Sequence, residues 1–221
     1  MFVAQIILPP QKRGSDKAPR LDIPDRGLLE NIFKYLHRNQ HIAGDNYKYL
    51  LGFPQMDNTK NTTGRVLQVF SDDEKSLKIH LSSNKLIGLI TDYCELSFHG
   101  LTKDILEKSE YYKIIRIRDE YNLPLSKIKR FIKRKSGAVY EMYLNEKMTA
   151  EEIQVRLRAD FDKKRKDNNI IEKQFIEYKS GNSSDVKIFL DNQDTDSKTI
   201  NIKNANSFGI SKDCSIPKII F

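Results

Sequence analysis

Apolar segments in the first half of the chain follow two different periods, and their order is the strongest constraint on the fold. Four short runs rich in β-branched and aromatic residues predict strands at residues 2–8, 47–53, 65–70 and 94–98. Apolar residues at helical spacing predict a helix over residues 25–40; they are Leu28, Leu29, Ile32, Phe33 and Leu36. A capping box formed by Ser71 and Glu74 predicts a second helical region that extends to about residue 92.

The resulting order, strand–helix–strand–strand–helix–strand, is the ferredoxin-like plan used by many RNA-binding modules. We therefore expect an α+β fold whose N-terminal domain, residues 1–110, is ferredoxin-like (RRM-like). A smaller α+β domain is expected over residues 111–221. Its predicted elements are a strand at 113–118, a basic helix at 126–135, a helix opened by Thr149 and Glu152, and strands near 174–179, 186–190 and 199–202.

Positive charge is concentrated in residues 113–135, which contain nine Lys or Arg side chains and two acidic ones. In the predicted helix at 126–135, Lys127, Arg130 and Arg134 fall on one row, and Lys129 and Lys133 flank that row. Like charges at this spacing repel one another, and a polyanion would relieve the repulsion. A helix of this kind suits the phosphate-lined deep groove of an RNA duplex. Taken alone, it suits a solvated face or a membrane surface equally well.

Composition narrows the possible partners. The chain has 221 residues, a formal net charge of +8 and 31% charged residues, and its isoelectric point near 9.3 favours an anionic partner. Its apolar runs are shorter than the roughly 18–20 residues that a membrane span requires, so no membrane association is expected. The two cysteines, Cys94 and Cys214, form no disulfide framework, which is typical of a reducing cytoplasm.

Two of the four histidines, His37 and His41, stand four residues apart on the first predicted helix. This is the spacing of a two-histidine metal site, but no acidic residue stands between them and no third ligand is evident, which disfavours such a site. The sequence also lacks a Walker loop, a GxSxG motif and a grouped set of carboxylates. No cofactor is therefore expected. RNA cleavage would need a histidine acting as general base on a ribose 2′-OH, leaving a 2′,3′-cyclic phosphate and a 5′-OH. Taken alone, His37 is better explained as a half-buried, hydrogen-bonded helix histidine.

Several motifs occur together in the order of one known family. The first helix contains FKYLH, ending at His37, and a GFP tripeptide ends at Pro54. The basic helix follows a strand that carries Arg116 and Arg118. The segment FIEYKS ends at Ser180, and FGISK begins at Phe208 with Pro217 further on. Together these motifs span about residues 2–221 and resemble the endoribonuclease that processes precursor CRISPR RNA in type I-F systems.

The resemblance implies a role for each matching residue. His37 would take the proton of the 2′-OH, and Ser180 would hold the ribose in line with the phosphorus. Phe208 stands where the family usually has a tyrosine that helps to orient the histidine, so it could stack on the ring but could not offer a hydroxyl. Arg116 and Arg118 would read base edges at the foot of the stem. The stem phosphates would be contacted by Lys127, Lys129, Arg130, Lys133 and Arg134.

The resemblance also implies the partners. The protein would bind the CRISPR repeat hairpin, cut on its 3′ side, remain on the product and join the backbone and large subunits of the type I-F surveillance complex. Two alternatives stay open on the residues themselves. One is an RNA-hairpin-binding module without catalytic activity. The other is a DNA-binding protein that inserts the basic helix into a major groove.

Overall fold

The computed structural model of the protein describes residues 1–11, 20–44, 48–60, 62–117, 123, 125–167, 175–179, 185–206, 209–211 and 213–221. The chain forms two compact units. Unit 1 comprises Met1–Ile117 together with Gln174–Phe221, and unit 2 comprises Arg118–Lys173. This division differs from the expected split at residue 110, because the last strands of the chain pair with a strand of the first segment.

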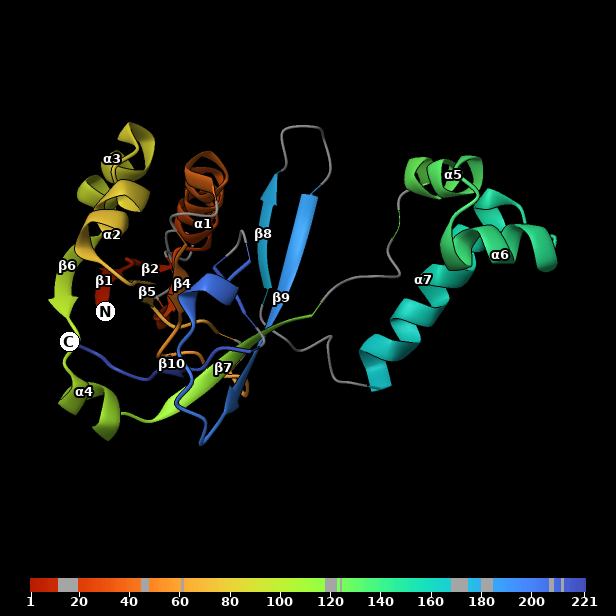
Figure 1. Ribbon diagram of the computed structural model, residues 1–221. Helices are drawn as coiled ribbons and strands as arrows, with labels where there is room; N and C mark the ends of the chain where they lie inside the picture. The colour runs from red at the N-terminus through yellow and green to blue at the C-terminus, as the bar shows by residue number, and fades with distance from the viewer. Residues whose placement is uncertain are drawn as a thin grey trace. The chain divides into compact units, whose positions relative to one another are not determined.

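The first sheet of unit 1 has four antiparallel strands in the order β4-β5-β1-β6 (Figure 1). The strands are β1 (Phe2–Ile7), β4 (Leu50–Gly52), β5 (Val66–Ser71) and β6 (Glu95–Gly100). All four strands predicted for the first half of the chain are therefore present, although β4 is shorter than predicted. Together with the helices, the antiparallel sheets give the α+β class that the sequence predicts.

Three helices accompany this sheet: α1 (Arg26–Ala43), α2 (Glu74–Leu81) and α3 (Asn84–Tyr93). The predicted helical region over 71–92 is thus two helices, separated at Ser82 and Ser83. The predicted capping box at Ser71 is wrong, because Ser71 ends β5 and Asp73 caps α2 instead. An Asp73 oxygen accepts a hydrogen bond from the Ser76 backbone N–H at 2.7 Å.

Helix α1 forms because its apolar residues repeat at helical spacing and because Asp25 caps its start. The Asp25 side chain accepts a hydrogen bond from the Leu28 backbone N–H at 2.9 Å. Four residues of the predicted stripe are buried, namely Leu29, Ile32, Phe33 and Leu36. The helix packs against α2, α3 and strand β8 (Phe175–Lys179), which comes from the far end of the chain (Figure 1).

A second sheet of unit 1 joins the middle and the end of the chain in the order β10-β7-β9-β8. Its other strands are β7 (Tyr111–Ile117), β9 (Asp185–Asp194) and β10 (Ile216–Pro217). The strand predicted at 199–202 is absent; the described chain there is irregular and leads into the short 3-10 helix η3 (Ile202–Asn204). Smaller elements complete the unit: β2 (Pro10–Gln11), β3 (Arg20–Pro24) and α4 (Lys103–Lys108).

Unit 2 consists, within its described residues, of the helices α5 (Leu125–Lys133), α6 (Gly137–Asn145) and α7 (Ala150–Asp167). The predicted capping box of α7 is confirmed: the Thr149 hydroxyl lies 2.8 Å from an oxygen of Glu152, whose backbone N–H donates to that hydroxyl. The core of this unit contains Ile128, Val139, Ala150, Ile153 and Leu157. The strands expected in a second α+β domain belong to unit 1. No described helix of the protein is long and apolar enough to cross a membrane.

Candidate functional site

His37 lies on α1 one turn after Phe33, at the edge of the buried stripe. Phe33 is fully buried and His37 is half-buried, so the imidazole stands between the core and the solvent. Its ring lies against that of His41, with 5.1 Å between the ring centroids and 69° between the planes. His41 itself is exposed. The two imidazoles therefore form an edge-to-face pair, as the four-residue spacing on a helix requires.

The predicted partner of His37, Ser180, lies outside the described residues. The strand that immediately precedes it is described: β8 ends at Lys179, which pairs with Asp185 of β9. Because β8 packs against α1, the fold brings the helix that carries His37 beside the strand that leads to residue 180. These two segments are more than a hundred residues apart in the sequence.

Phe208 also lies outside the described residues, but the chain beside it is held tightly. Gly209 has a φ of +67°, in the left-handed region, and its carbonyl accepts a hydrogen bond from the Leu51 N–H at 2.7 Å. A Cβ at this position would lie 2.3 Å from the ring of Tyr49, so only glycine fits. The Gly209 N–H donates to the Asn206 carbonyl at 2.9 Å, which closes a turn against β4.

Tyr49, on which this turn rests, is fully buried, and its ring lies 5.0 Å from that of His80. Burial raises the pKa of the Tyr49 phenol far above its usual range, so the side chain stays neutral. His80 is equally buried, and its carbonyl accepts a hydrogen bond from Asn39 Nδ2 at 2.6 Å. Sequence reasoning gave neither residue a role. Their depth in the core indicates that they support the turn and α1 rather than meet a substrate.

One of the two predicted base-reading arginines, Arg116, lies near the end of β7. Arg116 pairs with Leu190 of β9 through the backbone, and its side chain is not described. Arg118 lies outside the described residues. The fold therefore fixes the backbone at position 116 within the second sheet of unit 1.

All five predicted phosphate-binding cations are exposed: Lys127, Lys129, Arg130, Lys133 and Arg134. Helix α5 turns its apolar residues inward, with Ile128 fully buried and Phe131 half-buried. Two of the cations have contacts within unit 2. Lys127 Nζ stands 5.9 Å from the centre of the Phe131 ring, and Lys129 Nζ lies 3.0 Å from Glu151 Oε1. The exposed face of α5 is thus strongly positive.

The basic helix ends two residues earlier than predicted. Its last residue is Lys133, so Arg134 lies in the turn that follows. Lys135 adopts a left-handed φ of 50°, and the Ser136 N–H donates to the Phe131 carbonyl at 3.2 Å. This is the hydrogen bond of a Schellman-type helix end. Arg134 stays close to the helix because its N–H still donates to the Arg130 carbonyl at 3.0 Å.

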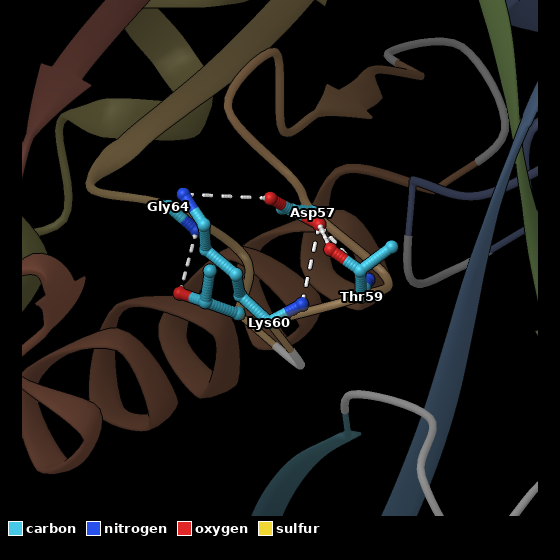
Figure 2. A network of polar contacts seen from close by, with 5 residues as sticks. Asp57, Thr59, Lys60 and Gly64 are labelled. Carbon is cyan, nitrogen blue, oxygen red and sulfur yellow. Dashed lines mark hydrogen bonds and ion pairs between the residues drawn. The ribbon is translucent and has the colours of Figure 1, made fainter.

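The loop between β4 and β5 is more ordered than its polar composition suggests (Figure 2). Asp57 Oδ1 accepts hydrogen bonds from the Thr59 hydroxyl at 2.6 Å, the Thr59 N–H at 2.9 Å and the Lys60 N–H at 3.2 Å. The bond from the Thr59 hydroxyl is the main cause of a lowered pKa at Asp57. The loop is therefore a closed polar turn. Among the described residues, no group of three or more His, Cys, Asp or Glu gathers in a way that could hold a metal ion.

Comparison with known proteins defines the class to which this fold and these residues belong. A family model described as CRISPR-associated protein (Cas_Csy4) matches residues 16–219. The match covers most of the chain, including both histidines of α1, the basic helix and the turn at Gly209. The protein is thus a CRISPR-associated endoribonuclease of the kind that processes repeat RNA. More particularly, the chain belongs to the type I-F precursor-CRISPR-RNA processing family, as the sequence motifs predict. No curated protein matches the chain.

Proposed function

We propose that the protein is a metal-independent endoribonuclease that binds the CRISPR repeat stem-loop, cuts on its 3′ side and stays bound to the product. The observation that carries this proposal is the packing of α1 against β8 in unit 1. The histidine helix and the strand leading to Ser180 are neighbours, which supports a shared site for the two residues. Family membership supports repeat RNA as the substrate.

In the proposed reaction, the imidazole of His37 takes the proton of one ribose 2′-OH. The 2′ oxygen attacks the adjacent phosphorus, the bond to the 5′ oxygen breaks, and a 2′,3′-cyclic phosphate and a 5′-OH result. Ser180 hydrogen-bonds the ribose and holds the nucleophile in line. The half-buried position of His37 suits a base that is held by the core on one side and reached by substrate on the other.

Phe208 supports the base by stacking and supplies no hydroxyl. The assignment is supported by family membership, since Phe208 stands where the family usually has the tyrosine that orients the histidine. We expect Phe208→Tyr to raise the cleavage rate, because it restores the hydroxyl that the family usually has at this position, and to leave RNA affinity unchanged. Single-turnover rates and Kd, measured on the same hairpin, separate these two effects.

The RNA stem is held by Arg116 and Arg118 at its foot and by the exposed cations of α5 along its phosphates. The exposure of the five α5 cations supports this assignment. Each phosphate contact displaces counterions, so we expect slow product release and a steep salt dependence of binding. As a product-bound protein, it would remain a cytoplasmic subunit of the type I-F surveillance complex, beside the backbone and large subunits.

For the first sheet we propose the ferredoxin-like arrangement. The support comes from the element order β1, α1, β4, β5, α2 with α3, β6, and from the antiparallel strand order β4-β5-β1-β6. In this arrangement the helices cover one face of the sheet.

The decisive experiment incubates the protein with its own repeat RNA in EDTA and identifies the product ends. Cleavage to a cyclic phosphate and a 5′-OH is expected to persist in EDTA. It should fall by about 10²–10⁴-fold in His37→Ala, the usual contribution of a general base. The control is Lys85→Ala, which removes an exposed side chain from α3 of the same unit and should cleave normally.

Three results would contradict the proposal. Loss of cleavage in EDTA would exclude the metal-free route. Tight hairpin binding without cleavage, equal in the wild type and in His37→Ala, would indicate a binding module without catalytic activity. Preference for duplex DNA over the RNA hairpin in direct competition would indicate a DNA-binding protein.

A further inference from the structure

The exposed face of α1 carries other basic side chains beside His37. Lys34, Arg38 and His41 are all exposed, and they stand three or four residues from His37 or from one another. Positions at these spacings are neighbours on a helix surface. The four side chains therefore form one patch, which we name the α1 patch. Its opposite side is the buried stripe of the same helix, so the patch faces solvent or substrate.

His41 is the second imidazole of this patch, and its ring is in contact with that of His37. The ring centroids are 5.1 Å apart and the planes meet at 69°, so the rings lie edge to face rather than stacked. His37 is half-buried and His41 is exposed. One imidazole is thus held by the core, and the other stands on the open side of the same patch.

Cleavage by a 2′-OH requires two proton transfers, and in the proposed reaction His37 carries out one of them by accepting the proton of the 2′-OH. The base takes a proton from the 2′ oxygen while the leaving 5′ oxygen develops negative charge and needs a proton. Imidazole can hold or release a proton near neutral pH, which makes histidine a common donor as well as a common base. The attacking and leaving oxygens flank a single phosphorus, so the donor has to stand close to the base.

We propose that His41 is the general acid of the reaction, an inference that rests on the proposed function. In this mechanism the imidazolium of His41 gives its proton to the 5′ oxygen as the bond between phosphorus and that oxygen breaks. His37 ends the step protonated and His41 ends it neutral. Exchange with water restores both. Lys34 and Arg38 lie beside the pair as additional positive charge for the phosphate.

The test uses two repeat RNA hairpins that differ in one atom. The first has the natural 5′ oxygen at the cut, and the second has a bridging sulfur in its place. A thiolate leaves without protonation, so a sulfur leaving group removes the need for a general acid. Single-turnover cleavage is measured on both hairpins for the wild type, His41→Ala, His37→Ala and Lys34→Ala. Lys34→Ala is the matched control, because it removes an exposed positive charge from the same face and leaves both imidazoles in place.

We expect His41→Ala to cut the oxygen hairpin about 10²–10⁴-fold more slowly than the wild type, and to cut the sulfur hairpin at nearly the wild-type rate. His37→Ala should be slow on both hairpins, and Lys34→Ala should show the same ratio to wild type on both. An equal defect of His41→Ala on both hairpins would overturn the proposal, as would normal cleavage of the oxygen hairpin by that variant.

The two hairpins also separate failure of the proposed nuclease function from failure of the His41 assignment. If the wild type cuts neither hairpin, the proposed ribonuclease function fails and His41 has no such role. If the wild type cuts both, and sulfur rescues His37→Ala instead of His41→Ala, the nuclease function stands and the assignment of His41 is wrong. Because His41 is exposed, its substitution should not unfold the protein; equal thermal midpoints for His41→Ala and the wild type check this.

Discussion

The two units of the protein are built in opposite ways. Unit 1 assembles its core from both ends of the chain: Gln5 Nε2 donates to the Phe221 carbonyl at 3.0 Å, and Gln68 Nε2 donates to the Ile219 carbonyl at 2.6 Å. The Phe221 ring stacks on that of His99, with 3.7 Å between the centroids. Unit 2, in contrast, is formed by a single continuous segment of the chain, and its described helices pack around a small core.

This contrast matches the two tasks that we propose. A reaction in which a base must meet one ribose needs positions fixed to a fraction of an ångström, which a sheet-based core with many long-range contacts can supply. Holding phosphates needs positive charge on an exposed face more than exact placement. We therefore expect substitutions in unit 1 to change the cleavage rate and substitutions in unit 2 to change RNA affinity.

The largest effect is expected at Gly209, which joins the tail of unit 1 to β4. In Gly209→Ala the new Cβ would overlap the buried ring of Tyr49 and also adopt a strained left-handed backbone. We expect unit 1 to lose about 4 kcal/mol of unfolding free energy. Hydrogen exchange of unit 1 amides measures this loss.

Gly137→Ala in unit 2 is the matched control for Gly209→Ala. Gly137 has a similar φ of +73°, but the space around its Cβ position is open within 4 Å. Only the backbone strain remains, at about 1 kcal/mol. Equal losses in the two variants would contradict the tight contact at Gly209.

The next effect concerns the small core of unit 2. Ile153 of α7 is fully buried there, and Ile153→Ala should cost about 3 kcal/mol, the usual range for such a truncation. Hydrogen-exchange protection should fall in residues 125–167 and persist in α1. Val155→Ala, on the same helix at 68% exposure, should change little. Equal loss of protection in α1 would mean that the two units unfold as one.

A moderate effect on RNA binding is expected from the cations of α5. Lys127→Ala combined with Arg130→Ala should weaken hairpin binding and lower the slope of log K against log salt by about two units, one for each lost phosphate contact. The cleavage rate of bound RNA should not change. Combined Lys75→Ala and Lys85→Ala, exposed lysines of unit 1, serve as the control for net charge. An unchanged slope in the α5 variant would exclude α5 from the RNA interface.

The smallest effect concerns the ion pair between Lys129 and Glu151, whose side chains are 58% and 60% exposed. The hydrogen bond from Lys129 lowers the pKa of Glu151, so the pair is present at neutral pH and is lost as the pH falls through that lowered pKa. Glu151→Gln should leave the unfolding midpoint of unit 2 unchanged at neutral pH, because exposed pairs contribute little.

The same substitution should tighten RNA binding slightly, because it removes a negative charge beside α5 and releases Lys129. Glu141→Gln, exposed on α6, removes the same charge away from this pair. Identical Kd values for Glu151→Gln and Glu141→Gln at low salt would show that release of Lys129 has no effect.

Local patterns predicted most elements of the fold but fewer of their ends. The stripe of α1 and the capping box of α7 depend on neighbouring residues alone, so both could be predicted from the sequence. The capping box at Ser71 was wrong because Asp73 offered a competing cap two residues later. The strand predicted near residue 200 was wrong because the chain there forms a short 3-10 helix instead of pairing in the sheet.

The residue types of the site could be predicted, since a histidine on an amphipathic helix and clustered cations are visible in the sequence. The roles of all these residues stay predictions, and Ser180, Phe208 and Arg118 also lie outside the described part of the chain. The contact between His37 and His41 follows from helix spacing.

The sequence by itself determined most of the helices and strands, where positive charge collects and to which family the motifs point, because these depend on neighbouring residues. Only the tertiary structure decided that the chain from residue 174 onward belongs to unit 1 and that β8 packs against α1. It also decided that position 209 must be glycine, because a Cβ there would overlap the ring of Tyr49. The reason is physical: strand pairing and close packing join residues far apart in the chain, and the energy of such contacts depends on the whole fold.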